Sequence, residues 1–121
     1  HNQSRRQRQM CIRDRNITHQ EFNSVLLNEY HDGGVGMGWH SDDEKELGIN
    51  PIIASVSLGA ERDFLFRHKK DKSKEKVKIL LKHGSLLLMM GSTQHHWHHS
   101  LPIRRKVKDR RINLTFRNIV S

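Results

Sequence analysis

Apolar and polar residues alternate one by one near the end of the chain. In the segment RINLTFR, residues 111–117, the apolar positions are Ile112, Leu114 and Phe116, and the residues between them are polar. A period of two is typical of a β-strand, because successive side chains of a strand point to opposite faces. We therefore predict a strand whose apolar face packs in the core between layers and whose polar face looks into a polar cavity or water.

Shorter runs of strand-like composition precede this segment and are separated by turn residues. They are FNSVLLNEY (22–30), IIASVSLG (52–59), DFLFRH (63–68) and VKILLKHGSLLLMMG (77–91), the last of which His83 and Gly84 divide into two strands. No stretch shows a convincing helical period. The pattern predicts an all-β sandwich or barrel.

The segments that connect these runs contain residues typical of turns and hairpin tips. The segment HDGGVGMG (31–38) predicts a glycine-rich turn that ends at Trp39. A turn at Gly59–Ala60 is expected to join residues 52–59 and 63–68 as a strand pair. The charged run KKDKSKEK (69–76) is typical of a solvated hairpin tip.

The first fifteen residues do not fit the strand pattern, since they are rich in Arg, Gln and Ser and show no apolar periodicity. The string QRQMCIRDR within them also resembles translated sequencing adapter. We therefore expect residues 1–15 to be a non-native or disordered tail. The rest of the chain has the length of one domain, which we place at residues 21–121 and expect to begin partway into its fold.

Charge and cysteine content indicate the kind of partner the protein binds and the redox state of its compartment. The formal net charge of +9 predicts attraction to nucleic acid, because contacts of Lys and Arg with phosphates release condensed counterions. A solvated basic surface would explain the same charge. Cys11 is the only cysteine, which excludes a disulfide framework and a cysteine-based zinc site and fits a reducing compartment.

No run in the sequence approaches the roughly 20 apolar residues of a membrane helix. We therefore expect a protein of the cytoplasm, or of the nucleus in a eukaryote, without a membrane partner. The sequence gives no signal for oligomerisation, so a monomer is the working assumption.

The first residues with evident chemistry are the triplet His40-Ser41-Asp42. On an extended strand, residues i and i+2 project from the same face, so an imidazole and a carboxylate would lie side by side. Iron(II) oxygenases bind their metal through two histidines and one carboxylate and leave the other positions open. The triplet can supply two of these ligands, although such a pair also arises by chance in many proteins.

A third ligand would come from a strand that is distant in sequence, and the tract His95-His96-Trp97-His98-His99 can supply it. Strand alternation would place His95, Trp97 and His99 on one face and His96 and His98 on the other. These residues alone leave the choice among the histidines open. A tract that binds zinc adventitiously, or that has no role on the surface, is the alternative.

The polar face of the last strand carries Arg111, Asn113, Thr115 and Arg117. A guanidinium group binds a carboxylate through two parallel hydrogen bonds, so a pair of arginines facing a metal site would suit the dicarboxylate 2-oxoglutarate. A polar strand face exposed to water is the alternative.

Five blocks of the sequence together resemble the AlkB family. They are HSDDE (40–44), IASVSLGAERDFLFRH (53–68), HGSLLLMMG (83–91), WHHSLP (97–102) and RINLTFR (111–117). The resemblance implies a double-stranded β-helix, or jelly roll, and an Fe(II)- and 2-oxoglutarate-dependent dioxygenase that removes alkyl groups from bases of DNA, or in some members of RNA. It also implies dioxygen as a cosubstrate, succinate as a product and formaldehyde released from methyl lesions. The family's opening strands and nucleotide-gripping lid would precede residue 21, so residues 21–121 would be a partial catalytic domain.

Carried over position by position, the resemblance makes His40, Asp42 and His99 the iron ligands, with His99 chosen because it precedes the SLP segment. Arg111 and Arg117 would hold the two carboxylates of 2-oxoglutarate. The other positions that match the cosubstrate site are Asn28, Tyr30, Asn113 and Thr115.

Two further residues match the substrate side of the family's site. Glu44 corresponds to an acidic position near the flipped base, and Trp39 would form part of the substrate pocket wall. Ordinary core packing is the alternative for both Tyr30 and Trp39.

Two other functions also fit these residues. The first is a dioxygenase of the same fold that acts on proteins or small molecules, which a flat salt dependence of substrate binding would favour over a nucleic acid enzyme. The second is a non-catalytic, histidine-rich module that binds a metal such as zinc, which succinate release would exclude.

Overall fold

The computed structural model describes residues 22–120, so the tail expected at residues 1–15 lies outside the described residues. Nearly all of the secondary structure is strand: β1 (Ser24–Tyr30), β2 (Met37–His40), β3 (Ile53–Gly59), β4 (Arg62–His68), β5 (Val77–Leu81), β6 (Leu86–Met89), β7 (Trp97–Leu101) and β8 (Arg111–Arg117). Two short helical segments complete it, the 3-10 turn η1 (Lys45–Leu47) and the helix α2 (Thr93–His96). Within the described residues, no helix has the length and apolar character needed to cross a membrane.

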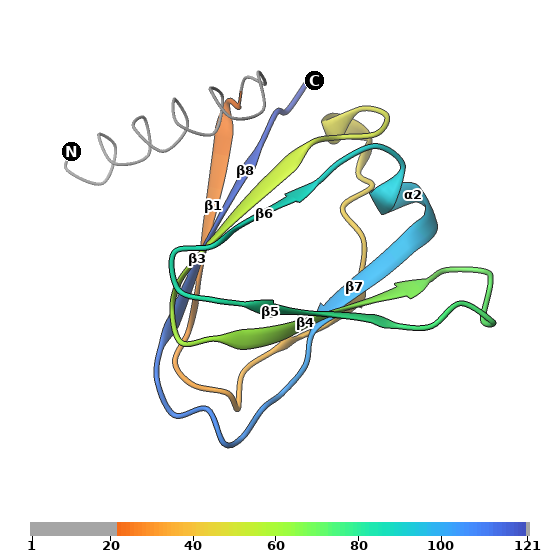
Figure 1. Cartoon of the computed structure of the whole chain (residues 1–121). Coiled ribbons are helices and arrows are strands. Elements are labelled where there is room, and N and C mark those ends of the chain that lie inside the picture. The colour runs from red at the N-terminus through yellow and green to blue at the C-terminus, as the bar shows by residue number, and fades with distance from the viewer. Residues whose placement is uncertain (1–21, 121) are drawn as a thin grey trace.

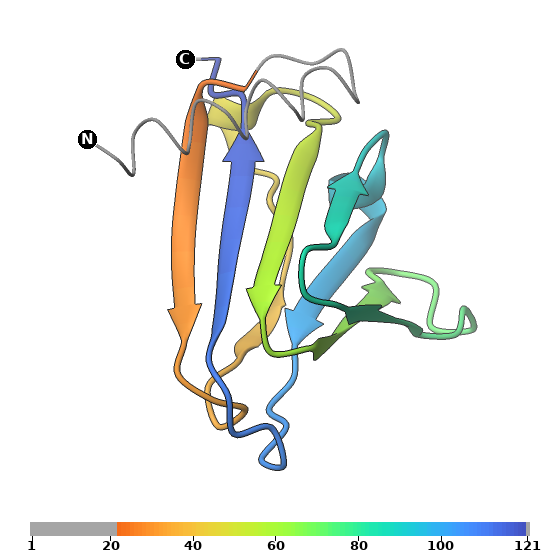
Figure 2. The same cartoon turned by 60° about the vertical axis from the view of Figure 1, so that its left-hand side comes forward.

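The strands form two antiparallel sheets that lie opposite each other (Figures 1 and 2). We call the sheet with the order β1-β8-β3-β6 the major sheet and the sheet with the order β2-β7-β4-β5 the minor sheet. Most neighbouring strands come from distant parts of the chain: β1, for example, pairs with β8 along its whole length, from Ser24 opposite Arg117 to Tyr30 opposite Arg111. This arrangement is a jelly roll, and it confirms the predicted all-β fold.

The expected pairing of residues 52–59 with 63–68 is wrong, because the turn between them carries the chain from one sheet to the other. β3 pairs with β6 and β8, whereas β4 pairs with β5 and β7. Gly59 permits this corner: its φ is 93°, and a Cβ at this position would lie 2.3 Å from the carbonyl oxygen of Arg110. The charged run 69–76 does connect the paired strands β4 and β5, as the sequence predicts.

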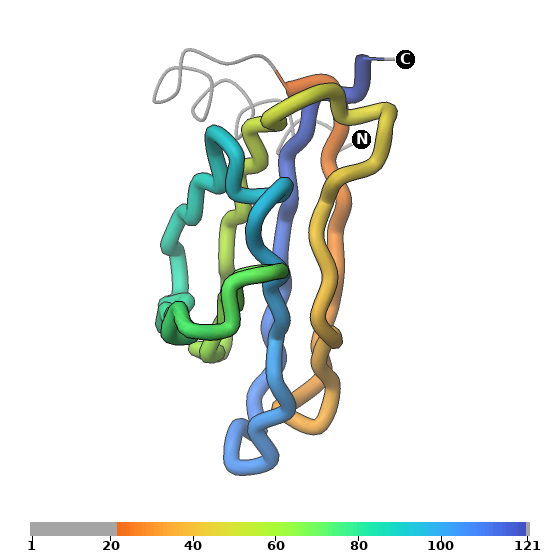
Figure 3. Tube along the Cα trace, turned by 90° about the vertical axis from the view of Figure 1, so that its right-hand side faces the viewer, coloured from red at the N-terminus to blue at the C-terminus, as the bar shows by residue number. Residues whose placement is uncertain are grey.

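Two loops meet at one end of the molecule, residues 31–36 and 102–110 (Figure 3). The backbone N–H of Gly33 donates to the carbonyl of Val107 at 2.8 Å, and that of Arg104 donates to the carbonyl of Gly33 at 2.7 Å. Arg62 is only 1% exposed and donates to three backbone carbonyls in and beside these loops, those of Asp32, Val35 and Pro102. One buried cation therefore helps to join the segment after β1 to the segment after β7.

Apolar residues pack on both sides of the major sheet. Between the sheets lie two clusters built around Tyr30, Leu81 and Leu101 and around Leu47, Ile53, Phe66 and Met89. The apolar face of β8, with Leu114 and Phe116, packs instead with Ala54 in a cluster formed only by the major sheet and residues next to it. The expectation that this face lies between the layers is therefore wrong, and the polar face of β8 is the one that looks toward the minor sheet.

The neighbours of β8 explain this orientation. Asn113 lies opposite Asn28 on β1 and Ser57 on β3, so polar residues face one another across the strands. Leu114 lies opposite Leu27 and Val56, so the apolar face is matched in the same way. Side chains that lie opposite each other on one face of a sheet interact directly. The polar face of β8 is therefore part of a polar patch that extends across three strands.

We predict that Gly59→Ala lowers the free energy of unfolding more than Gly84→Ala does. Both residues have a positive φ, which costs an alanine about 1–2 kcal/mol. Only at Gly59 would the new Cβ meet a backbone atom, whereas nothing lies within 4 Å of it at Gly84; overpacking adds roughly 1–3 kcal/mol. Urea unfolding of both variants measures the difference. Equal losses of unfolding free energy would contradict the close approach of the backbone at Gly59.

Candidate active site

The strand β2 contains a bulge that turns His40 inward. Met37 lies opposite Leu101 and His40 lies opposite His99, so β2 has one more residue than β7 between these two pairs. On a regular strand, residues three positions apart face opposite sides. The extra residue changes this, as bulges commonly do, and Met37 and His40 both line the cavity between the sheets.

His40, Asp42 and His99 come together at this point. Each offers one ligand atom, and these atoms all lie within 4.8 Å of one another. Nε2 of His99 is 3.7 Å from Oδ2 of Asp42, and the two imidazole rings are 4.3 Å apart between centroids. Because β2 ends at His40, Asp42 does not lie on an extended strand, which corrects the reason we gave for expecting it beside His40.

The hydrogen bond of His40 and the burial of His99 suit metal binding. Nδ1 of His40 lies 2.8 Å from the carbonyl oxygen of Gly38; since a carbonyl only accepts, Nδ1 is the donor of this bond, and Nε2 is the ring nitrogen that remains to bind a metal. Burial lowers the pKa of His99 to about 3, with further lowering by His40 and Arg117. His99 is therefore neutral at neutral pH and can act as a ligand.

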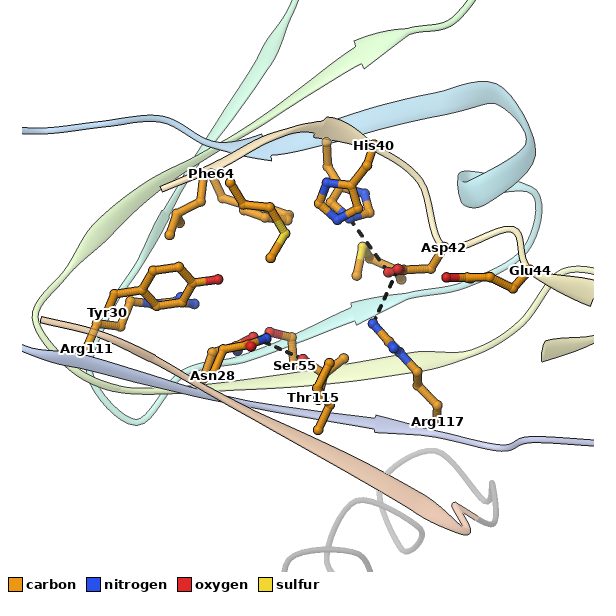
Figure 4. A pocket seen from close by; sticks show the side chains of 16 residues that line it. Asn28, Tyr30, His40, Asp42, Glu44, Ser55, Phe64, Arg111, Thr115 and Arg117 are labelled. Atoms are coloured by element: carbon orange, nitrogen blue, oxygen red, sulfur yellow. Dashed lines mark hydrogen bonds and ion pairs between the residues drawn. The ribbon is translucent and has the colours of Figure 1, made fainter. Parts of the chain in front are cut away.

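The opposite wall of the cavity is the polar face of the major sheet (Figure 4). The cavity has a volume of about 270 Å³. The residues of this wall that the sequence singled out are Asn28, Tyr30, Arg111, Asn113, Thr115 and Arg117. All six thus lie around the same space as His40, Asp42 and His99, and Glu44 lies at its edge.

Hydrogen bonds fix the middle of this wall. Nδ2 of Asn113 donates to Oγ of Ser55 at 2.7 Å and to the carbonyl of Val56 at 3.0 Å. Oγ1 of Thr115 donates to Oδ1 of Asn113 at 3.0 Å. The amide of Asn113 is thus engaged on both its nitrogen and its oxygen, which holds the polar face of β8 in one arrangement.

The two arginines occupy different parts of the cavity wall. Arg117 forms an ion pair with Asp42, with 3.3 Å between Nη2 and Oδ1. Arg111 donates to Oγ of Ser57 at 3.0 Å and lies 5.4 Å from the centre of the Tyr30 ring. Burial raises the pKa of Tyr30, and the charges of Arg111 and Arg62 oppose this rise. Tyr30 therefore remains a neutral hydrogen-bonding group at neutral pH.

These residues fit both a divalent metal and a dicarboxylate. Two imidazoles and one carboxylate are the ligand set that non-haem iron(II) oxygenases use. The Nε atoms of Arg111 and Arg117 are buried without a hydrogen-bond partner among the described residues. Buried cations of this kind are stabilised by a carboxylate that accepts their hydrogen bonds.

Trp39 is not among the residues that line this cavity, and its expected place in the substrate pocket wall stays a prediction. Its ring contacts two cations instead, Arg67 at 4.4 Å and Lys76 at 5.8 Å from the ring centre. The bulge that turns His40 inward leaves Trp39 on the other face of the minor sheet.

The histidine tract is also arranged differently from the expected strand. His95 and His96 belong to the helix α2, and only the part from Trp97 onward is strand. The alternation expected over the whole tract is therefore wrong, although His99 does face the cavity.

The buried polar residues near the site that sequence reasoning missed include Ser55, Ser57, Arg62 and Gln94. Arg62 alternates with Phe64 and Phe66 on β4, so its place in the strand pattern predicts that it points into the interior. Gln94 has no such signal, because its helix is too short to show a period.

A sequence model described as the 2OG-Fe(II) oxygenase superfamily matches residues 3–117. The chain belongs to this superfamily. The name of the superfamily includes iron(II) and 2-oxoglutarate, the metal and cosubstrate that the sequence predicts.

Named relatives confirm the resemblance to the AlkB family. The DNA oxidative demethylase ALKBH2 of Bos taurus is 52% identical over 117 residues, which cover 90% of this chain and 42% of the relative. The alpha-ketoglutarate-dependent dioxygenase alkB homolog 3 of Rattus norvegicus is 47% identical over 105 residues, covering 81% of this chain and 36% of the relative. The chain thus spans less than half the length of these relatives.

A solved structure described as that of OsALKBH1 superimposes with a TM-score of 0.65 at 26% sequence identity. The match covers 82% of this chain and 49% of the other. It supports the jelly-roll fold independently of the strand assignments.

We predict that Arg117→Lys weakens 2-oxoglutarate binding about tenfold or more. An ammonium group cannot reproduce the two parallel hydrogen bonds of a guanidinium group, and a hydrogen bond to a charged group contributes roughly 1.5–3 kcal/mol. Calorimetric titration of 2-oxoglutarate into the Mn(II)-loaded protein measures this. Arg67→Lys, which changes an arginine outside the cavity lining, is the matched control. An unchanged affinity in Arg117→Lys would show that this residue does not hold the cosubstrate.

Proposed function

We propose that this chain is the catalytic core of an AlkB-type oxygenase that oxidatively removes alkyl groups from bases of nucleic acid, with DNA as the expected polymer and RNA as the alternative. The observation that carries the proposal is the shared cavity: a two-histidine, one-carboxylate cluster faces a buried arginine, Arg111, and a partly buried one, Arg117, across a space of about 270 Å³. The names of the ALKBH2 and alkB homolog 3 relatives support the reaction and the substrate class.

In this proposal His40, Asp42 and His99 hold the iron, and the position of each arginine assigns it one carboxylate of 2-oxoglutarate. Arg117 contacts Asp42, so it would bind the carboxylate beside the metal. Arg111 lies beside Tyr30, so it would bind the other carboxylate. When bound, iron and 2-oxoglutarate supply the oxidising chemistry, in which dioxygen converts 2-oxoglutarate to succinate and carbon dioxide and hydroxylates the N-alkyl carbon.

The remaining residues orient the cosubstrate and limit access to the metal. Asn28, Asn113 and Thr115 line the wall between the two arginines and would fix the cosubstrate in the middle. Glu44 is exposed at the cavity edge, where a carboxylate would meet the incoming base. A base must leave its stack to reach this depth, and alkylated bases that pair poorly do so at the lowest cost.

Two exposed basic segments are the candidate contacts with the phosphate backbone. The tip of the β4–β5 hairpin carries Lys70, Lys72 and Lys74, and the loop before β8 carries Lys106 and Lys108. Backbone contacts of this kind provide affinity without reading sequence. As part of the same proposal, we place the protein in the cytoplasm, or in the nucleus of a eukaryote, where such substrates occur.

We predict that His40→Ala and Asp42→Ala each abolish turnover of a methylated oligonucleotide while the fold is retained. Each variant removes one of the three clustered side chains that would hold the metal. Mass spectrometry of the oligonucleotide and circular dichroism measure activity and fold. His95→Ala, which changes a histidine outside this cluster, is expected to retain activity. Iron-dependent turnover in either variant would show that the substituted residue is not an iron ligand.

We also predict that binding to a methylated oligonucleotide weakens steeply with salt, and that Lys72→Gln together with Lys106→Gln reduces the slope. Each lost phosphate contact lowers the slope of log affinity against log salt by about 0.7 for single strands and about 0.9 for duplex DNA. Fluorescence anisotropy at several salt concentrations measures it. A flat response in the unmodified protein would favour a protein or small-molecule substrate instead.

A further inference from the structure

A buried glutamine lies behind the metal cluster. Gln94 belongs to the helix α2, which directly precedes the strand that carries His99. Its side chain is among the most buried in the described chain, with 2% exposure. It is not part of the lining of the central cavity, so it contacts neither the proposed iron nor the cosubstrate.

The amide of Gln94 binds the backbone of a proposed metal ligand. Its Oε1 accepts a hydrogen bond from the backbone N–H of Asp42 at 2.8 Å. Its Nε2 lies 3.4 Å from Sδ of Met89. Turning the amide over would place its NH₂ group against the N–H of Asp42, donor against donor, so only one orientation is compatible with both contacts.

Asp42 depends on this contact because it lies beyond the end of β2. The last pair in register between β2 and β7 is His40 opposite His99, so the backbone N–H of Asp42 takes no part in the ladder. Asp42 is 6% exposed, and a buried N–H that lacks an acceptor is strongly disfavoured. Gln94 therefore fixes the backbone from which the carboxylate extends.

The same contact joins two segments that are far apart in sequence. Asp42 follows β2, and Gln94 lies five positions before His99 on the way into β7. A shift of either segment would stretch the Gln94–Asp42 hydrogen bond. The position of the carboxylate relative to His99 is thus linked to a single buried amide.

We propose that Gln94 is a positioning residue of the metal centre, holding Asp42 so that its carboxylate faces His40 and His99. This inference rests on the proposed function, because it assumes that the three residues bind a divalent metal. Partners that orient a ligand without touching the metal typically contribute 10–100-fold to metal affinity.

The test compares two substitutions of similar size. Gln94→Met fills the same space and removes the acceptor. Gln94→Glu keeps an oxygen acceptor, because burial favours the protonated carboxyl, which still presents a carbonyl oxygen. If Gln94 served only for packing, Met would be tolerated at least as well as Glu. If it positions Asp42, Glu retains metal affinity better than Met.

Calorimetric titration of Mn(II) into the metal-free protein, without 2-oxoglutarate, measures the affinity directly. We expect Gln94→Met to bind Mn(II) at least about tenfold more weakly than the unmodified chain, and Gln94→Glu to lie closer to it. His95→Met, on the same helix but exposed, is the matched control and should bind normally. Urea unfolding of each metal-free sample establishes that the protein titrated is folded.

A second readout separates positioning from a general loss of stability. With Co(II) as the probe, the ligand-field absorption of Gln94→Met should differ from that of the unmodified chain, because the carboxylate is displaced. Equal Mn(II) affinity and an unchanged Co(II) spectrum in Gln94→Met would overturn the inference and leave the proposed function intact. An unmodified chain that binds neither metal would overturn both.

Discussion

Two guanidinium groups between the sheets, that of Arg111 buried and that of Arg117 partly buried, are the constraint on which the rest of the site depends. Arg111 and Arg117 lie on the inward face of β8, where cations are stable only with anionic or strongly polar partners. Serine, asparagine and threonine side chains lie beside them on the same face of the major sheet. The interior of this jelly roll therefore contains a polar cavity, and the apolar residues of β8 pack on the outer side of the major sheet.

Asp42 connects this cationic wall to the metal cluster. Its carboxylate lies within reach of Arg117 on the major sheet and of His99 on the minor sheet. The bulge in β2 directs His40 into the cavity from the minor sheet, which also carries His99. Burial keeps His99 neutral. A metal and a dicarboxylate would each neutralise a charge that the cavity already holds, so the two sites are electrostatically linked through one aspartate.

The sequence was sufficient for most of the strands, for the fold class and for the histidine, aspartate and arginine side chains that meet in the cavity, because strand alternation and the AlkB-like blocks both encode them. It misplaced features that depend on pairing between distant segments. Nothing local shows that Gly59 is a corner between sheets, that an extra residue in β2 leaves Trp39 outside, or that His95 and His96 are helical. Gln94 was missed because its role depends on Asp42, which lies fifty-two positions away.

In the proposed site, three side chains bind one metal beside a pair of arginines that hold a dicarboxylate. A crystal structure grown without oxygen in the presence of Mn(II) and 2-oxoglutarate tests it most directly. We expect a single metal bound by His40, Asp42 and His99, with the two carboxylates of 2-oxoglutarate directed to Arg111 and Arg117. A metal bound elsewhere, or a dicarboxylate that contacts neither arginine, would contradict it.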